Sequence, residues 1–327
     1  MSVRSPIRTV LVTHKNLDEV RPILDQRAGE VAIHYLSDLG QIKPTVERVK
    51  PDAIFSISQS TYPGSAQRAA IDHPTVRWFH VGGSGYEYIV PWDHQRVTVT
   101  NGLGILAPFL AETALTGMLM LNGNFLRYAE QQRERTWQPI FFKPLQGQTL
   151  LIVGLGKIGS LVAANAKALG MHVLATRRTP APDPYVDEVH GDEALEELIG
   201  QADFVSLHVR MSEQNRGMFN ADMLAKMKLK SFLINTSRGP VVDEAALTDA
   251  VQRGHLGGAY LDVFEQEPLS PDSPLWDVPN LHVSAHSSVS VDRYVDDVFD
   301  LFEDNLARFV SREPLRNIID MEALVLR

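Results

Sequence analysis

The sequence predicts an α/β protein with two domains, each built on a doubly wound parallel sheet. Short β-branched runs alternate with helical patterns along the chain, which is typical of parallel α/β units. Several of these runs are apolar almost without alternation, as expected when helices cover both faces of a sheet. A chain of 327 residues is also long enough to form two hydrophobic cores.

The first hundred residues predict one compact domain. Its strand candidates are residues 9–14, 31–36, 53–58, 76–83 and 97–101, and its helical stretches include 44–50 and 65–72.

A second series of strands and helices begins at Leu150. Its strand candidates are residues 150–154, 172–176, 203–209, 231–237, 259–264 and 281–286, and its helices include 157–169, 192–200, 222–227 and 244–252. The very apolar region 104–123 contains Pro108 and Glu112, so we expect a buried helix there rather than a membrane span. The polar segment 127–139 is expected to form an exposed helix or arm.

No further strand is expected after His286. Apolar residues at helical spacing over 291–310 predict a long helix that returns to the first domain. We therefore expect a discontinuous substrate-binding domain of residues 1–102 and 288–327, and a dinucleotide-binding domain of residues 103–287. The cleft between such domains is the natural ligand site.

Composition excludes several classes of function. With 31 basic and 40 acidic residues the net charge is −9, which argues against nucleic acid or an anionic membrane as the main partner. Without cysteine the chain has no disulfide, thiolate nucleophile or cysteine-ligated metal. The N-terminal apolar run is shorter than a signal peptide requires, so we expect a cytoplasmic protein.

A glycine-rich turn, VGLGKIG, lies between the strand 150–154 and the helix 157–169. Gly154 permits the tight turn, Gly156 lets the backbone approach a pyrophosphate, and Gly159 allows close packing of helix on strand. The amides of Lys157 and Ile158 would face that anion. A second strand follows about twenty residues on, which completes the context of a dinucleotide site. We therefore expect a Rossmann domain beside a smaller flavodoxin-like α/β domain.

The strand 172–176 ends without the acidic residue that normally binds the ribose of NAD. Thr176, Arg177 and Arg178 stand there instead, and the next acid, Asp183, comes only after two prolines. Two guanidinium groups suit a 2′-phosphate, which predicts a preference for NADPH, with NADH still possible. The alternative is a solvated basic turn with no ligand.

Three polar clusters at later strand ends could carry hydride chemistry on a carbonyl. Arg238 can anchor a substrate carboxylate, and His286 can donate a proton, helped by the neighbouring charge of Glu267. Glu265 is the nearest alternative to Glu267, and His208 is the nearest alternative to His286. No histidine and carboxylate cluster has metal-ligand spacing, so no metal is expected.

These blocks resemble the D-isomer-specific 2-hydroxyacid dehydrogenases over nearly the whole chain. The similar segments are LLIVGLGKIG, LINTSRGPVVDEAAL, GAYLDVFEQEPLSPDSPLW and NLARFVSREPLRNIID. The resemblance implies that Arg238 binds the substrate carboxylate, that Glu267 orients His286, and that His286 protonates the carbonyl oxygen. It also implies that Asp262 contacts the nicotinamide carboxamide. The strand-end residues His208 and Thr236 are expected at the cofactor as well.

The segment HVGGSGYEYI of the first domain is similar to the glycine loop of that family. Its amides at Ser84 and Gly85 would bind the substrate carboxylate. A purely structural interpretation is a turn whose glycines need positive φ.

The chain departs from the family pattern around His286. Ala285 replaces the usual proline, and Ser287 and Ser288 replace small apolar residues, so extra hydroxyl groups could face the substrate.

The predicted function is NADPH-dependent reduction of a small 2-oxo acid, such as glyoxylate or hydroxypyruvate, to the D-2-hydroxy acid. The alternatives are an NAD-dependent enzyme for a larger substrate and a corepressor-like protein that senses dinucleotides without turnover. Glu267 argues against the formate dehydrogenases, which carry glutamine there. The resemblance also implies a homodimer, with the dinucleotide-binding domain and the arm of residues 122–142 at its interface.

Overall fold

The computed structural model describes residues 9–27, 31–57, 64–288, 290–291 and 294–321. The chain divides into two compact units, the first formed by Met1–Leu106 with Val291–Arg327 and the second by Ala107–Ser290. Both crossover points lie a few residues beyond those that the sequence suggests.

Unit 1 contains a sheet of five parallel strands. In spatial order they are β2 (Ala32–Leu36), β1 (Thr9–Thr13), β3 (Ala53–Ser56), β4 (Trp78–Val81) and β5 (Thr98–Asn101). The order β2-β1-β3-β4-β5 is that of flavodoxin-like domains, as predicted.

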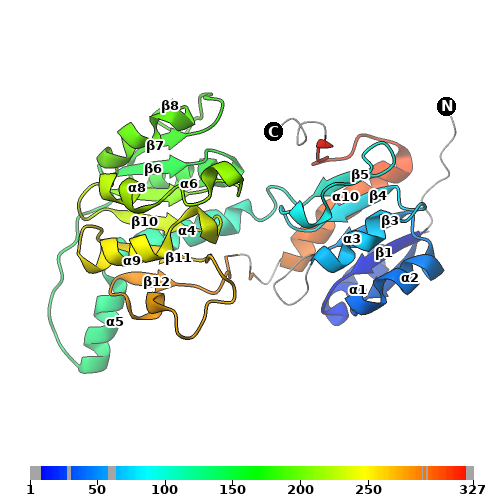
Figure 1. Ribbon diagram of the computed structural model, residues 1–327, viewed down its shortest axis with the longest axis horizontal. Coiled ribbons are helices and arrows are strands. Elements are labelled where there is room, and N and C mark those ends of the chain that lie inside the picture. Colours follow the sequence, from blue (N-terminus) through cyan, green and yellow to red (C-terminus); the bar gives the residue numbers. More distant parts are fainter. Residues whose placement is uncertain (1–8, 28–30, 58–63, 289, 292–293, 322–327) are drawn as a thin grey trace. The chain divides into compact units, whose positions relative to one another are not determined.

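Helices cover both faces of this sheet (Figure 1). They are α1 (Leu17–Arg27), α2 (Ile42–Val49), α3 (Arg68–Ile71), which continues the 3₁₀ turn Gly64–Gln67, and α10 (Tyr294–Ser311). One core lies under α2 and α3, and the other lies under α1 and α10. In the second core Phe302 of α10 stacks on Trp78 with ring centroids 5.1 Å apart, which ties the end of the chain to strand β4.

Unit 2 contains a sheet of seven parallel strands. In spatial order they are β12 (Leu281–Val283), β11 (Gly258–Leu261), β10 (Phe232–Asn235), β9 (Phe204–Leu207), β6 (Thr149–Val153), β7 (His172–Thr176) and β8 (Glu188–His190). The order runs outward in both directions from β6, which is the doubly wound Rossmann arrangement.

The helices of unit 2 again lie on two faces (Figure 1). They are α4 (Ala107–Asn122), α5 (Phe125–Glu134), α6 (Lys157–Ala168), α7 (Leu195–Leu198), α8 (Ala221–Lys226) and α9 (Glu244–Gln252). Helices α4 and α6 bury one core against the sheet, and α7, α8 and α9 bury the other. Helix α4 approaches β11 so closely that a β-carbon on Gly117 would lie 2.6 Å from the ring of Tyr260.

The segment after α4 is an exposed arm. No residue of α5 is buried, and the side chains of Trp137 and Phe141 are 98% and 96% exposed. The expectation of an exposed helix or arm is therefore confirmed.

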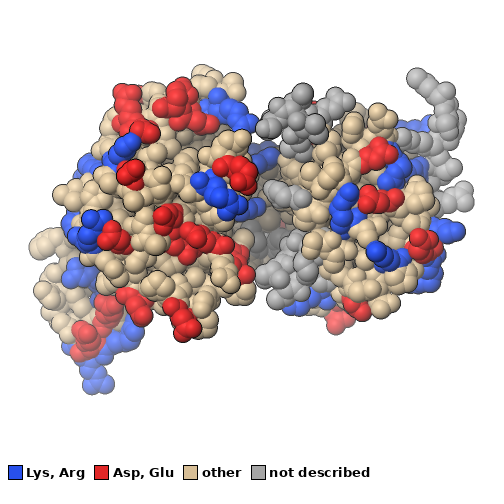
Figure 2. All heavy atoms as spheres, in the orientation of Figure 1, with Lys and Arg blue, Asp and Glu red and all other residues tan. Residues whose placement is uncertain are grey.

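Among the described residues, no helix is both long and apolar enough to cross a bilayer. Figure 2 shows acidic and basic side chains interspersed over the described surface of the face in view.

Candidate active site

The carboxyl edge of the seven-stranded sheet gathers the residues expected at the cofactor. Gly154 follows β6, Thr176 ends β7, His208 follows β9, and Thr236 follows β10. Because β7, β6, β9 and β10 are neighbours in one parallel sheet, these four positions share one edge.

The glycine turn after β6 is shaped by close backbone contacts. Gly154 has φ +98°, and a β-carbon there would lie 2.8 Å from the carbonyl of His208. A β-carbon on Gly159 would lie 2.7 Å from the carbonyl oxygen of Gly154. A β-carbon on Gly156, in contrast, would meet nothing within 4 Å. The turn is thus tight on the protein side and open at Gly156, as a bound pyrophosphate would require.

Helix α6 begins in this turn without a capping side chain. Gly156 occupies the N-cap, Lys157 is the exposed first residue of the helix, and the amide of Ser160 donates to the carbonyl of Gly156 at 2.9 Å. The amides of Ile158 and Gly159 have no carbonyl partner within the helix, as in any first turn. With the helix dipole they form a site that favours an anion.

Three buried polar atoms near this edge lack a hydrogen-bond partner among the described residues: Thr176 Oγ1, His208 Nδ1 and Thr236 Oγ1. A buried polar atom without a partner costs about 1–3 kcal/mol. A ligand rich in hydroxyl, phosphate and amide groups would satisfy them, so the residues present fit a dinucleotide.

Two arginines follow strand β7, and neither has an acidic partner among the described residues. Arg177 is half-buried and Arg178 is exposed, and neither forms an ion pair with a described residue. Asp183 is engaged elsewhere, because its carboxylate accepts hydrogen bonds from Ser160 Oγ at 2.7 Å and from the amide of Tyr185 at 3.0 Å. Two arginines therefore follow Thr176, while the carboxylate of Asp183 lies beside Ser160 near the start of α6.

Arg238 follows β10 on a segment pressed against the loop after β11. A β-carbon on Gly239 would lie 1.9 Å from the backbone carbonyl of Phe264, so only glycine fits there. Arg238 itself is exposed, and its Nη1 donates to the carbonyl of Ser237 at 2.7 Å.

Glu267 and His286 form a direct pair. His286 Nδ1 lies 2.7 Å from Glu267 Oε2, while Glu267 Oε1 accepts from the amide of Phe264 at 3.0 Å. The rival Glu265 is turned away, since its carboxylate accepts from the amide of Glu244 at 3.3 Å and its own amide donates to Glu244 at 2.6 Å.

Contact between the two groups shifts the pKa of each in the direction that favours its charged form. The hydrogen bond with Glu267 raises the pKa of His286 against the opposing effects of burial and of Arg238. Burial acts to raise the pKa of Glu267, but the hydrogen bonds from His286 and Phe264, with the charge of Arg238, outweigh it and lower that pKa.

His208 has the opposite character to His286. Burial lowers its pKa to about 4, and Ser206 Oγ lies 2.9 Å from its Nε2. A ring that stays neutral at pH 7 is a poor proton donor, so the structure favours His286 over His208 for that role.

Asp262 is buried at the end of β11 and binds the segment that carries His286. Its carboxylate accepts from Ser284 Oγ at 2.6 Å, from the amide of Ser287 at 2.9 Å, and from both the amide and the hydroxyl of Ser288. The idea that both extra hydroxyls face the substrate is therefore wrong for Ser288, which is buried against Asp262. The sequence carried no signal for Ser284, because its role depends on a partner 22 residues away.

Ser84 and Gly85 belong to unit 1. Their amides donate no hydrogen bond to the described residues, and Ser84 is exposed. The positive-φ interpretation of this loop is wrong, since its glycines have ordinary φ. Close packing favours glycine at position 82 instead, because a β-carbon there would lie 2.9 Å from the ring of Phe55.

Comparisons with known proteins identify the family to which the chain belongs. A family model described as D-isomer specific 2-hydroxyacid dehydrogenase, NAD binding domain, matches residues 115–288. The glyoxylate reductase of Korarchaeum cryptofilum is 31% identical over 333 residues, covering 94% of this chain and 96% of that protein. The (S)-sulfolactate dehydrogenase of Chromohalobacter salexigens is 42% identical over 180 residues, covering 54% and 58%.

A solved structure is similar over the full length. The NADPH-dependent glyoxylate/hydroxypyruvate reductase of Sinorhizobium meliloti, in complex with NADP and sulfate, has 25% identity and a TM-score of 0.82, covering 97% of this chain and 99% of that one. The fold, the glycine turn and these relatives define an NAD(P)-dependent oxidoreductase. The chain belongs to the D-isomer-specific 2-hydroxyacid dehydrogenase family.

Proposed function

We propose that this protein reduces a small 2-oxo acid, of the glyoxylate or hydroxypyruvate type, to the D-2-hydroxy acid with NADPH. The observation that carries the proposal is the 2.7 Å contact between His286 and Glu267, with the charge of Arg238 acting on both. The names of the relatives from Korarchaeum cryptofilum and Sinorhizobium meliloti support the substrate class.

Each polar residue of the site has a separate task in this reaction. When bound, the nicotinamide cofactor would supply a hydride to the carbonyl carbon. Arg238 holds the substrate carboxylate and polarises the carbonyl, and the amides of Ser84 and Gly85 bind the same carboxylate. With Nδ1 engaged by Glu267, the free Nε2 of His286 gives its proton to the carbonyl oxygen. The neutral imidazole then takes a proton from water.

The dinucleotide would lie along the carboxyl edge of the sheet. The first-turn amides of Lys157 and Ile158, with Gly154, Gly156 and Gly159, would hold the pyrophosphate. Thr176, His208 and Thr236 would bind through the polar atoms that lack partners in the described chain. Asp262 would also bind the carboxamide of the nicotinamide. Its carboxylate would then hold that group in addition to the four hydrogen bonds that it already accepts.

The preference for NADPH rests on Arg177 and Arg178. Changing both to alanine removes the charge that would bind the 2′-phosphate, so the Kd for NADPH should rise about ten-fold or more. The Kd for NADH should change little. Fluorescence titration with both cofactors measures the difference. Arg216→Ala, which removes an exposed arginine 3.8 Å from Glu213, is the control for general loss of charge. Equal losses for NADPH and NADH would contradict the phosphate role.

The substrate class is tested with a panel of acids and both cofactors. We expect NADPH oxidation with glyoxylate or hydroxypyruvate, and a loss of about 100-fold or more in kcat for His286→Ala, because the proton donor is removed. The binding of NADPH should survive this change.

Other outcomes of the panel select the other candidate functions. Tight NADPH binding without turnover of any 2-oxo acid would favour the dinucleotide sensor. Oxidation of (S)-sulfolactate with NAD would favour a larger, more anionic substrate, and the relative from Chromohalobacter salexigens is the reason to include it.

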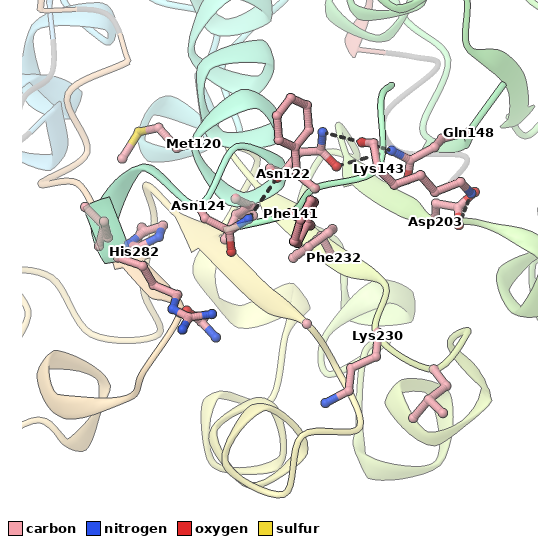
Figure 3. Close-up of a pocket in the computed structure, with 17 residues that line it drawn as sticks. Met120, Asn122, Asn124, Phe141, Lys143, Gln148, Asp203, Lys230, Phe232 and His282 are labelled. Carbon is pink, nitrogen blue, oxygen red and sulfur yellow. Dashed lines mark hydrogen bonds and ion pairs between the residues drawn. The ribbon is translucent and has the colours of Figure 1, made fainter. Parts of the chain in front are cut away.

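We also propose that the protein acts as a homodimer through its arm. At the base of the arm a cavity of about 470 Å³ lies between Phe141, Phe142 and the starts of several strands of the seven-stranded sheet (Figure 3). Trp137, Phe141 and Phe142 are exposed aromatic side chains of the arm, and a second copy would cover them.

A further inference from the structure

A hydroxyl clamp fixes the segment that carries His286. We define it as Ser284 and Ser288, whose hydroxyl groups both donate to the buried carboxylate of Asp262. The two serines stand on either side of His286, two residues before it and two after it. Tyr260 extends the clamp, because its hydroxyl lies 2.8 Å from Ser284 Oγ.

The backbone at His286 needs such support. It has φ +49°, in the left-handed region that residues other than glycine rarely occupy. The imidazole side chain is about half exposed, and among the described residues its side-chain hydrogen bond is the one to Glu267. Packing alone therefore does not hold the ring in place.

The amide hydrogen bonds to Asp262 are available to any residue type, but the hydroxyl bonds are not. Amides at 287 and 288 would remain if both side chains were alanine, whereas both side-chain donors would be lost. A hydrogen bond to a charged acceptor is stronger than one between neutral groups. The two serine side chains therefore supply the part of the clamp that is particular to this sequence.

We propose that Ser284 and Ser288 are positioning residues, which hold His286 against Glu267 by fastening its segment to Asp262. The inferred effect on turnover rests on the proposed function, while the effect on the geometry of His286 does not.

Three charged groups act on His286: Glu267, Asp262 and Arg238. The hydrogen bond with Glu267 is the largest influence and raises the pKa of His286, whereas the charge of Asp262 raises it less. Loss of the clamp would leave Asp262 with fewer donors, which by itself would strengthen its effect on the ring. Because the contact with Glu267 dominates, displacement of the ring should still lower the pKa of His286.

The experiment compares Ser284→Ala, Ser288→Ala and the double variant with Ser287→Ala in the intact chain. Ser287 is the matched control, since its side chain is exposed and it contributes to Asp262 only through its amide. NMR titration of the His286 imidazole is the first readout. We expect the pKa to fall in each clamp variant, most in the double one, and to stay unchanged in Ser287→Ala. Tyr260→Phe should give a smaller fall, because Ser284 keeps its bond to Asp262.

The second readout is turnover of the 2-oxo acid. A misplaced proton donor should lower kcat about ten-fold in the double variant and change KM less. An unchanged titration of His286 in both single clamp variants would overturn the proposal, as would an equal fall in Ser287→Ala. The NMR result stands even if the wild-type protein reduces no 2-oxo acid, so failure of the clamp and failure of the proposed function are distinguishable. If the double variant does not fold, the single variants decide.

Discussion

Two histidines at the same edge of the sheet have opposite acid–base character. His286 is beside a carboxylate, so the pKa of its ring is raised and a proton is available for transfer near neutral pH. His208 is beside a serine hydroxyl and is buried, so its pKa falls to about 4 and its ring stays neutral. The residue type is the same in both cases, and the neighbouring atoms decide the chemistry.

The pH dependence of reduction should follow the Glu267–His286 pair. Reduction needs the protonated imidazole, so activity falls as pH rises through the raised pKa of His286. Glu267→Gln removes the charge that raises this pKa, so the alkaline limb of kcat/KM should move to lower pH. The pH profile of reduction measures the shift.

Glu265→Gln is the matched control for this change. The carboxylate of Glu265 accepts from the amide of Glu244, and among the described residues it forms no hydrogen bond or ion pair with His286, so the alkaline limb should stay in place. A Glu267→Gln profile identical to wild type would remove Glu267 as the residue that tunes His286.

At the residue scale, the sequence identified polar groups at strand ends but not their supports. Arg238, Glu267 and His286 could be proposed because a cation, an acid and an imidazole follow successive apolar strands. Ser284 and Tyr260 could not, because a serine and a tyrosine have many structural uses and their partner is visible only in space.

At the scale of elements, the long apolar patterns predicted most strands and helices. Strand β7 and helix α9 have the predicted bounds. Strand β11 ends at Leu261, whereas the prediction also included residues 262–264. The amide of Asp262 still donates to the carbonyl of Asn235 at 3.0 Å, while its carboxylate accepts from Ser284 of the next segment.

Two elements had no clear sequence pattern. Strand β8 has three residues and is only partly buried at the sheet edge, so it shows no apolar run. Helix α1 contains Pro22 and many charged residues, which weaken a helical pattern, yet its residues Val20 and Leu24 are buried against the sheet of unit 1. Tertiary packing overrides local preference in both.

At the scale of the whole molecule, the chain leaves unit 1 and returns to it. Helix α10 is more than two hundred residues from β3 in sequence, but Phe299 and Phe302 lie against Phe55 of that strand, with ring centroids 4.6 and 5.1 Å away. The amphipathic pattern predicts that this helix has a buried face. It does not by itself say which sheet covers that face.

The proposed dimer gives a prediction at this scale. The double change Trp137→Ser and Phe141→Ser removes two almost fully exposed aromatic side chains from the arm, so a dimer that buries them should dissociate. Size-exclusion chromatography with light scattering should show a dimer for the wild-type chain and a monomer for the variant. Trp276→Ser, an exposed tryptophan outside the arm, should leave the mass unchanged. A wild-type monomer, or a variant that stays dimeric, would contradict the proposal.

The sequence by itself determined the two parallel sheets, the glycine turn and the basic end of β7, because these depend on local patterns of apolar residues, glycine and charge. Only the tertiary structure decided which carboxylate meets His286, that Asp262 anchors the segment around it, and that Asp183 is engaged by Ser160. Those contacts join side chains that are roughly twenty residues apart along the chain. Their distances depend on how the loops after neighbouring strands pack together, and no local pattern encodes that packing.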